Sequence, residues 1–208
     1  MAMEIGREAS AAAMRRVATV LTAGQQQLTE LDQAVGDGDL GITAAKIAQA
    51  LETHAASEAD DDLGKFLSQG GMAINRVASS TMGTLIATAL MRAAREIRGK
   101  STLTPPDLAA MLSAADQGIQ ERGKAKPGDK TVIDTLHPAA EAFAAAITAG
   151  ETPARAATRM LDAARQGLAS VTPLRNKVGR ASWVGERTEG KVDPGCALMV
   201  MILEAIVG

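Results

Sequence analysis

Large aromatic side chains are almost absent from this chain, which has two Phe, one Trp and no Tyr in 208 residues. Its core must therefore be built from Leu, Ile, Val, Met and many Ala. Because alanine is the strongest helix former, whereas aromatic and β-branched residues favour strands, this composition predicts helices. The same scarcity removes the stacking platform that binders of single-stranded nucleic acid use.

Apolar residues recur at helical spacing along most of the chain. Met14, Val17, Ala18 and Leu21 stand at i, i+3, i+4 and i+7, which marks one face of an opening helix. Similar stripes run through residues 42–54, 63–74, 85–97, 108–119, 132–147, 156–168 and 197–206. No stretch alternates long enough to predict a strand.

Helix starts and stops are marked at several places. Three pairs place a capping side chain before a proline at the first helical position: Thr104-Pro105, Thr152-Pro153 and Asp193-Pro194. Gly99 and Gly150 stand where left-handed helix ends are expected. With mostly short connections, these signals predict one domain over residues 1–208, with seven to nine antiparallel helices.

Charge and hydropathy exclude several classes of protein. The chain has 22 basic and 24 acidic residues, a net charge of -2, and no basic run, which argues against binding of nucleic acid. No apolar stretch approaches the roughly 20 residues of a membrane span, so no membrane partner is expected. The stretch Met1 to Arg16 lacks the apolar core of a signal peptide, and a single cysteine, Cys196, fits a reducing cytoplasm. The sequence is compatible with assembly into a homo-oligomer.

Residues 31–41 interrupt the helical pattern and gather three carboxylates, Asp32, Asp37 and Asp39, among glycines. A compact turn that carries several carboxylates suits a hard cation. The spacing does not match an EF-hand, because the glycine and the glutamate that this calcium loop requires are Ile42 and Ala48 here. Magnesium is the better fit. The alternative is that Asp32 caps a helix and that the other two are ordinary turn residues.

Three more segments break the pattern. Residues 78–83 offer hydroxyls before a helix expected to start near Leu85, which suits either a bound phosphate or simple capping. Residues 126–131 predict a turn into a helix capped by Asp129 or Thr131, and a solvated turn is the alternative. Residues 178–195 hold the single tryptophan, Trp183, beside two arginines, and arginine is suited to phosphate, so a function is favoured over an ordinary surface loop.

Together these motifs resemble a known family. The order Leu-Asp…Gly-Asp-Gly-Asp-x-Gly, Pro-Gly-Asp-Lys-Thr and Gly-Arg-Ala-Ser-Trp-Val-Gly-Glu-Arg…Val-Asp-Pro-Gly is similar to that of the nucleotide-binding L subunit of dihydroxyacetone kinase, over nearly the whole chain. The resemblance implies an all-α fold, an antiparallel eight-helix barrel or bundle with the nucleotide site at one end.

The resemblance also implies site residues. Three aspartates of the family hold two Mg²⁺ ions that grip the phosphates of ADP or ATP, and the matching positions are Asp32, Asp37 and Asp39. Positions that line the nucleotide in the family match Leu40, Gly41, Ile42, Thr43, Ser80, Thr81, Met82, Gly123, Val132, Arg180, Asp193, Pro194 and Gly195. No catalytic residue is expected in this chain, because the family holds its substrate through a histidine of a separate K subunit.

The family therefore implies a kinase subunit that is active only with its partner and phosphorylates a short ketose. Such a subunit either exchanges ADP for ATP or keeps its ADP bound. In the second case, a phosphoprotein relay subunit would phosphorylate the bound ADP with a phosphoryl group from phosphoenolpyruvate. Two departures stand out: Leu40 replaces the usual histidine, and Ser79-Ser80-Thr81-Met82-Gly83-Thr84 replaces a glycine-rich phosphate loop. They leave open a subunit for another ketose such as erythrulose, or a non-catalytic regulatory or binding module.

Overall fold

The computed structural model of the chain describes residues 5–57 and 61–208, so the first four residues of the expected domain and of its polar N-terminal stretch lie outside it. Within these ranges there are nine α-helices and one 3₁₀ helix. They are α1 (Arg7–Ala23), α2 (Gln25–Gln33), α3 (Leu40–Ala55), α4 (Leu63–Val77), α5 (Thr81–Glu96), α6 (Pro105–Gly123), α7 (Ile133–Thr148), α8 (Pro153–Val171), η1 (Arg180–Thr188) and α9 (Pro194–Val207). The described ranges contain no strand, only an isolated bridge between Ile5 and Leu103. The all-α prediction is confirmed.

Helices α1 and α2 form one bent rod. Only Gly24 separates them, and its N–H still donates to the carbonyl of Val20 at 2.9 Å, while Leu28 N–H donates to the Gly24 carbonyl at 3.0 Å. A Cβ at Gly24 would lie 2.0 Å from Cε of Met201 in α9, so the glycine lets α9 approach the bend. Counted this way, the described part of the chain has eight long rods, as the resemblance implies.

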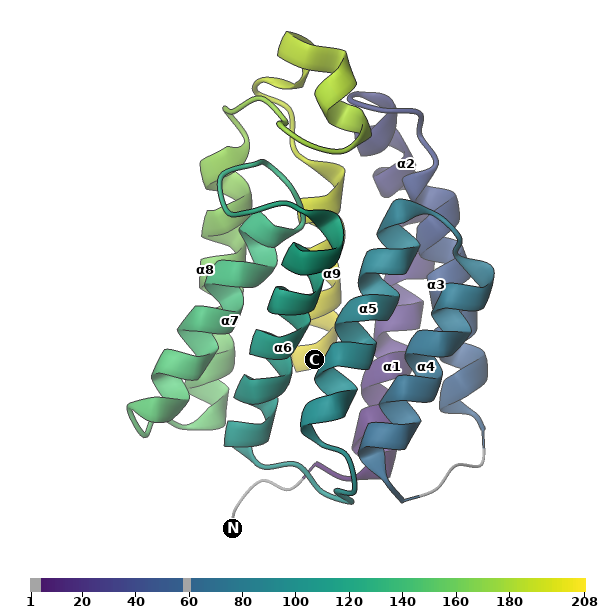
Figure 1. Cartoon of the computed structure of the whole chain (residues 1–208), viewed down its shortest axis with the longest axis vertical. Coiled ribbons are helices and arrows are strands. Elements are labelled where there is room, and N and C mark those ends of the chain that lie inside the picture. The colour runs from purple at the N-terminus through teal and green to yellow at the C-terminus, as the bar shows by residue number, and fades with distance from the viewer. Residues whose placement is uncertain (1–4, 58–60) are drawn as a thin grey trace.

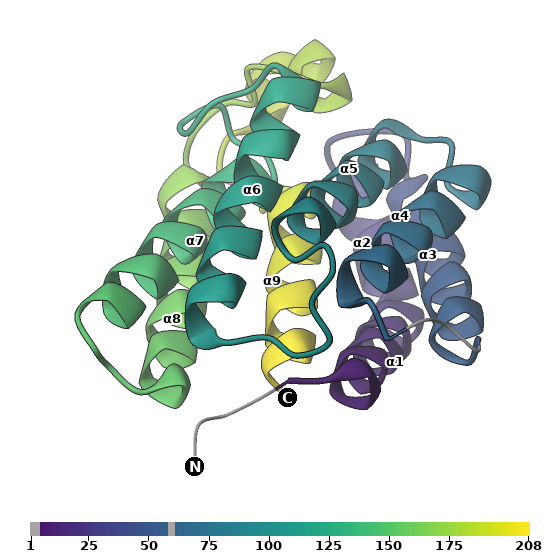
Figure 2. The ribbon, with the colours of Figure 1, turned by 60° about the horizontal axis from the view of Figure 1, so that its bottom comes forward.

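The rods close into a barrel. Helix α1 contacts α3, each later helix contacts the next one through α8, and α9 contacts both α8 and α1. Figure 2 shows α6, α7 and α8 on one side of α9 and α1 to α5 on the other. The core is formed mainly by aliphatic side chains and by many alanines, such as Leu21, Ile47 and Ala139, and these small residues let neighbouring helices pack closely.

The helix starts that the sequence marks are confirmed. The side chains of Thr152 and Asp193 accept the backbone N–H groups of Arg155 and Cys196, at the starts of α8 and α9. Helix α6 begins at Pro105. Gly99 and Gly150 adopt positive φ angles of 80° and 76°, as left-handed ends require.

Three details differ from the sequence-based expectation. Helix α2 was not expected, because its sequence is mostly polar and carries no clear apolar stripe. Helix α5 begins at Thr81, one turn before Leu85, because the Ser80 hydroxyl caps it by accepting Gly83 N–H at 3.1 Å. The segment 178–195, expected to be irregular, contains η1, which is broken by Gly185 at φ 66°.

Because the rods alternate in direction, every second connection lies at the same end of the barrel. These are residues 34–39, 78–80, 124–132 and 172–193, and Figure 1 shows them at the top, opposite the N-terminus. We call this the loop end, and we call residues 172–193, between α8 and α9, the strap. None of the described helices combines the length and the apolar run that a membrane span requires.

Candidate functional site

The three aspartates of the first motif lie together at the loop end. Asp32 stands on the last turn of α2, Asp37 lies in the connection, and Asp39 directly precedes α3. One carboxylate oxygen of each lies within 4.8 Å of those of the other two. Asp32 Oδ2 also accepts the backbone N–H of Leu40 at 3.1 Å. The connection therefore folds back and aligns three carboxylates.

Two glycines allow this tight turn. Gly38 has φ +79°, a conformation that other residues rarely adopt. A Cβ at Gly36 would lie 2.7 Å from Oδ1 of Asp32. A side chain at either position would move the carboxylates apart.

Burial raises the pKa of Asp32, the N–H of Leu40 opposes this rise, and the negative charges of Asp37 and Asp39 add to it. Such mutual repulsion is relieved when a cation binds between the carboxylates. The site thus combines hard oxygen donors with an electrostatic demand for positive charge.

Arg180, from the strap, supplies positive charge at this point. Its Nη1 donates to Oδ2 of Asp39 at 2.7 Å and also to Oδ2 of Asp37. The hydrogen bond to Asp39 raises the pKa of Arg180 above its usual value, so the guanidinium stays charged. Residues more than 140 positions apart in sequence, which belong to two separate motifs, therefore meet at the loop end.

The hydroxyl motif joins the same end. The buried Thr43 of α3 donates from Oγ1 to Oγ of Ser80 at 3.0 Å. Ser80 in turn accepts Gly83 N–H, so the capping alternative describes what its hydroxyl does. The exposed Thr81 and the half-buried Met82 then form the first turn of α5, where unpaired backbone N–H groups favour an anion.

The start of α9 approaches the same place. A Cβ at Gly195 would lie 2.9 Å from Cε of Met82 and 3.5 Å from the backbone N of Val132. Pro194 is the buried first residue of α9. Asp193 is buried, its Oδ1 accepts Cys196 N–H, and burial raises its pKa. Its carboxylate therefore holds the helix start in place.

The remaining expected residues differ in exposure. Ile42 is 55% exposed on the first turn of α3, and Gly123 ends α6 next to Leu85 of α5. Gly41 is buried, and a Cβ there would lie 2.0 Å from Oγ1 of Thr29. Gly41 therefore allows α2 and α3 to pack closely at the start of α3.

Other hollows lie away from these residues. One groove runs between α4 and α5 along Gly64, Met72, Met91 and Arg95, and another runs between α7 and α8 along Ala142, Ala149, Arg159 and Gln166. Neither contains a residue that the sequence predicted for the site.

Two buried polar residues at this end are not among those that the sequence predicts for the site. Lys130 lies under the base of the strap, and Asn176 belongs to the strap and donates from Nδ2 to the Lys130 carbonyl. The sequence predicts that Asp129 or Thr131 caps α7; the Thr131 hydroxyl accepts Ile133 N–H at 3.2 Å, whereas Asp129 accepts Lys126 N–H. A polar turn gives no sign that its lysine points inward, and the available signal was the place of Lys130 in the Pro-Gly-Asp-Lys-Thr motif.

The DAK2 domain family model matches residues 34–208 of the chain. The ADP-binding subunit DhaL of the PEP-dependent dihydroxyacetone kinase of Escherichia coli (strain K12) is 28% identical over 193 residues, which cover 93% of this chain and 92% of that protein. The corresponding subunit of dihydroxyacetone kinase 2 of Listeria innocua is 30% identical over 184 residues, covering 86% of this chain and 84% of that protein.

Among solved structures, the dihydroxyacetone kinase of C. freundii in complex with AMP-PNP and Mg²⁺ has a similar fold, with a TM-score of 0.70 and 22% identity. The match covers 95% of this chain but only 33% of that one, so this fold forms about a third of the larger kinase chain.

Proposed function

The chain belongs to the DAK2 domain family, and on that premise we propose that it is the nucleotide-binding subunit of a dihydroxyacetone-type kinase. It would bind ADP or ATP with Mg²⁺ at the loop end, and the phosphoryl group would pass to a short ketose held elsewhere. The observation that carries this proposal is the meeting of three carboxylates and one arginine from separate motifs. We further propose that residues 1–208 act as one domain, because α1 and α2, which lie wholly before the family match, pack against α3 and α9.

Asp32, Asp37 and Asp39 are the proposed metal ligands. Their carboxylate oxygens are the donors that Mg²⁺ prefers, and their spacing within 4.8 Å lets one ion contact all three. We propose two ions, as the family resemblance implies. When bound, Mg²⁺ would neutralise the charge of the nucleotide phosphates.

The remaining residues fall into two proposed roles. Arg180 and the first turn of α5, at Thr81 and Met82, are placed to meet phosphate anions. Ile42 and Gly123 border the exposed surface of the loop end. The other expected nucleotide-site residues support these from within: Leu40, Gly41, Thr43, Ser80, Val132, Asp193, Pro194 and Gly195.

We propose that the ketose is bound by a K subunit or K domain, whose histidine would hold it. The two bacterial relatives described above are ADP-binding subunits of PEP-dependent kinases, which favours bound ADP recharged by a phosphoprotein relay over exchange of free ATP. The two routes differ in whether nucleotide copurifies with the chain.

The direct test is phosphoryl transfer by a mixture of this chain and a K subunit. Dihydroxyacetone and erythrulose are each supplied, with either Mg-ATP or phosphoenolpyruvate plus the relay proteins. We expect transfer from at least one donor to at least one ketose. Tight complex formation without turnover would contradict the kinase proposal and favour a regulatory module.

The variant Asp37→Asn tests the metal assignment. It removes one charge from the cluster and keeps the shape of the side chain, so the affinity for Mg-ADP should fall by more than about tenfold. The matched control is Asp162→Asn, at an exposed aspartate on α8, which should bind as the wild type does. Unchanged binding in Asp37→Asn would show that the metal lies elsewhere.

A further inference from the structure

Lys130, in the connection between α6 and α7, is completely buried. Its ammonium group donates three hydrogen bonds, to the carbonyls of Thr172 at 2.9 Å, Leu174 at 2.8 Å and Thr188 at 2.7 Å. A lysine ammonium has three N–H donors, so all of them are used. Burial lowers the pKa of Lys130 and the charge of Asp193 opposes this, yet a buried charge is tolerable when it is fully hydrogen-bonded.

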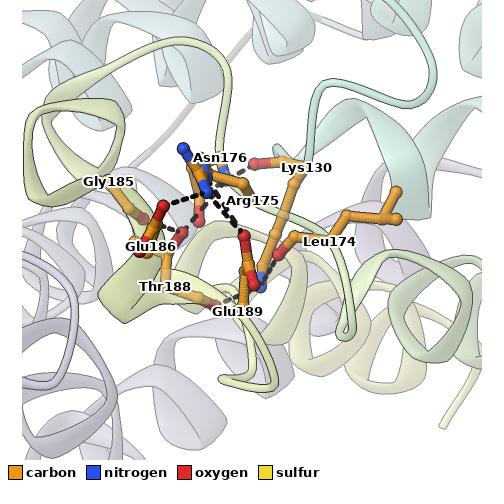
Figure 3. A network of polar contacts seen from close by, with 8 residues as sticks. All are labelled: Lys130, Leu174, Arg175, Asn176, Gly185, Glu186, Thr188 and Glu189. Carbon is orange, nitrogen blue, oxygen red and sulfur yellow. Dashed lines mark hydrogen bonds and ion pairs between the residues drawn. The ribbon is translucent and has the colours of Figure 1, made fainter.

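The three carbonyls come from the two ends of one projecting segment. Thr172 and Leu174 follow directly on the C-terminus of α8, where carbonyl groups and the helix dipole both favour a cation. Thr188 is the last residue of η1. Figure 3 shows Lys130 reaching toward Leu174 and Thr188, so one ammonium group draws both ends of the segment together.

Asn176 reinforces this connection. Its Nδ2 donates to the carbonyl of Lys130 at 2.7 Å and to Oδ2 of Asp193 at 2.8 Å. Its backbone N–H donates to Oγ1 of Thr188 at 3.2 Å. The base of the strap is therefore built from buried polar groups that hydrogen-bond to one another and favour one arrangement, although Oδ1 of Asn176 has no partner among the described residues.

Two further kinds of contact hold the strap: the backbone N–H of Lys177 donates to the carbonyl of Asp129 at 3.0 Å, and side-chain pairs lie on the surface. Arg175 pairs with Glu186 and Glu189 on the surface, and exposed pairs of this kind contribute little. Between the two fixed ends lie Arg180, which reaches the aspartates, and Trp183, which is 86% exposed. The position of Arg180 thus depends on how firmly the base is held.

We propose that Lys130 is a positioning residue, which closes the base of the strap and so places Arg180 over Asp37 and Asp39 without touching the nucleotide itself. This inference rests on the proposed nucleotide function for its effect on binding. The effect of Lys130 on the strap does not depend on the nucleotide function, so the position of the strap and the nucleotide affinity are tested separately.

Trp183 provides a direct signal for the strap. It is the single tryptophan of a chain that has no tyrosine, so the intrinsic fluorescence comes from the strap alone. In Lys130→Met, which removes the donors but keeps an unbranched side chain, the anisotropy of Trp183 should fall because the segment gains local motion. The matched control Lys46→Met changes an exposed lysine on α3 and should leave the anisotropy unchanged.

A double-mutant cycle separates positioning from general loss of structure. Lys130→Met should weaken binding of Mg-ADP by about tenfold in the wild-type background, as loss of an orienting residue does. In the background of Arg180→Ala it should cost less than about twofold, because the residue that it positions is already gone. A purely structural lysine would cost the same in both backgrounds.

The milder variant Lys130→Gln keeps the test decisive if Lys130→Met does not fold. It removes the charge but keeps a shorter side chain with an amide N–H₂ donor, so it should change anisotropy and affinity in the same direction, by less. Unchanged anisotropy in a folded Lys130→Met, or in Lys130→Gln if only that variant folds, would overturn the proposal, as would equal losses of affinity in the two backgrounds. If the wild type bound no Mg-ADP, the proposed function would fail, while the anisotropy would still decide whether Lys130 holds the strap.

Discussion

Single residues set the charge of the loop end. Asp32, Asp37 and Asp39 bring negative charge together, and Arg180 balances part of it from the strap. The guanidinium of Arg180 bridges two carboxylates, so it occupies the place where a metal ion bound by these aspartates would lie. In the proposed site, the arginine and Mg²⁺ would therefore compete for Asp37 and Asp39 until a phosphate offers the arginine another partner.

This competition predicts opposite effects of one substitution. In Arg180→Ala, Mg²⁺ alone should bind about two- to fivefold more tightly, because an exposed ion pair no longer has to be broken. Mg-ADP should bind about tenfold more weakly, because a charged hydrogen bond to phosphate is lost. Isothermal calorimetry with Mg²⁺ and with Mg-ADP measures both effects. Arg187→Ala, at an exposed arginine of the same strap, is the control, and equal behaviour of the two variants would contradict the competition.

The sequence predicts some of these residues and not others. The aspartate cluster could be found because its members lie within eight positions and glycines stand between them. The family resemblance predicted that Arg180 belongs to the same site, but its contact with the aspartates is shown only by the structure, since spacing says nothing about residues so far apart. Lys130 and Asn176 were missed because polar residues in loops are usually exposed, and only the fold shows that these two are buried.

At the scale of helices, close packing depends on a few glycines. Pro138 lies inside α7 and cannot donate to the carbonyl of Asp134, four residues before it. Helix α8 places Gly167 against that carbonyl, and a Cβ at this position would lie 1.9 Å from its oxygen. The free carbonyl of α7 is therefore covered by the closely packed backbone of α8 at Gly167.

Gly167→Ala should lower the free energy of unfolding by about 1–3 kcal/mol, because the added methyl group meets backbone that cannot turn away. Denaturant unfolding followed by circular dichroism measures this change. Gln166→Ala, on the exposed face of the same helix, should have little effect. Equal free energies of unfolding for Gly167→Ala and Gln166→Ala would contradict this prediction, because they would show that α7 and α8 can move apart around the methyl group without loss of stability.

The start of α6 should make the stability of the folded protein depend on pH in the acid range. Hydrogen bonds from the side chain of Lys100 and the backbone N–H of Thr104 lower the pKa of Asp107 from 3.8 to about 2. A carboxyl whose pKa is lower in the folded state stabilises the fold above its unfolded value, and this stabilisation disappears as the pH falls from 3.8 to about 2.

Thermal unfolding of wild type and Asp107→Asn across this pH range tests the effect. The melting temperature of the wild type should exceed that of the variant above pH 4, and the difference should shrink toward pH 2. Asp162→Asn should follow the wild type throughout. A difference between wild type and Asp107→Asn that stays constant with pH would contradict the assigned role.

Helices with an apolar stripe were predicted correctly, and elements without one were not. Helices α3 to α9 follow the stripes, and proline and glycine mark several of their ends. Helix α2 has only one buried residue, Leu28, so periodicity could not identify it. The two short turns of η1 are divided by Gly185 and bury only Thr188, so they too have no apolar stripe that could identify them.

For the whole molecule, the decisive property is the alternation of rods around a closed ring (Figure 1). Alternation brings connections 34–39, 78–80, 124–132 and 172–193 to one end, where motifs separated by up to 150 residues or so can form one site. The sequence contains each motif, but the order of packing brings them together. This is why the family resemblance, which carries the arrangement with it, predicted more of the site than any spacing did.

The central claim is that this loop end binds nucleotide through a metal. The most direct test is calorimetric titration of the chain with ADP, with and without Mg²⁺, after any copurified nucleotide has been identified and removed. The account predicts binding that requires Mg²⁺, or ADP that copurifies and is released only when the metal is chelated. Absence of ADP binding by the metal-loaded protein would contradict it.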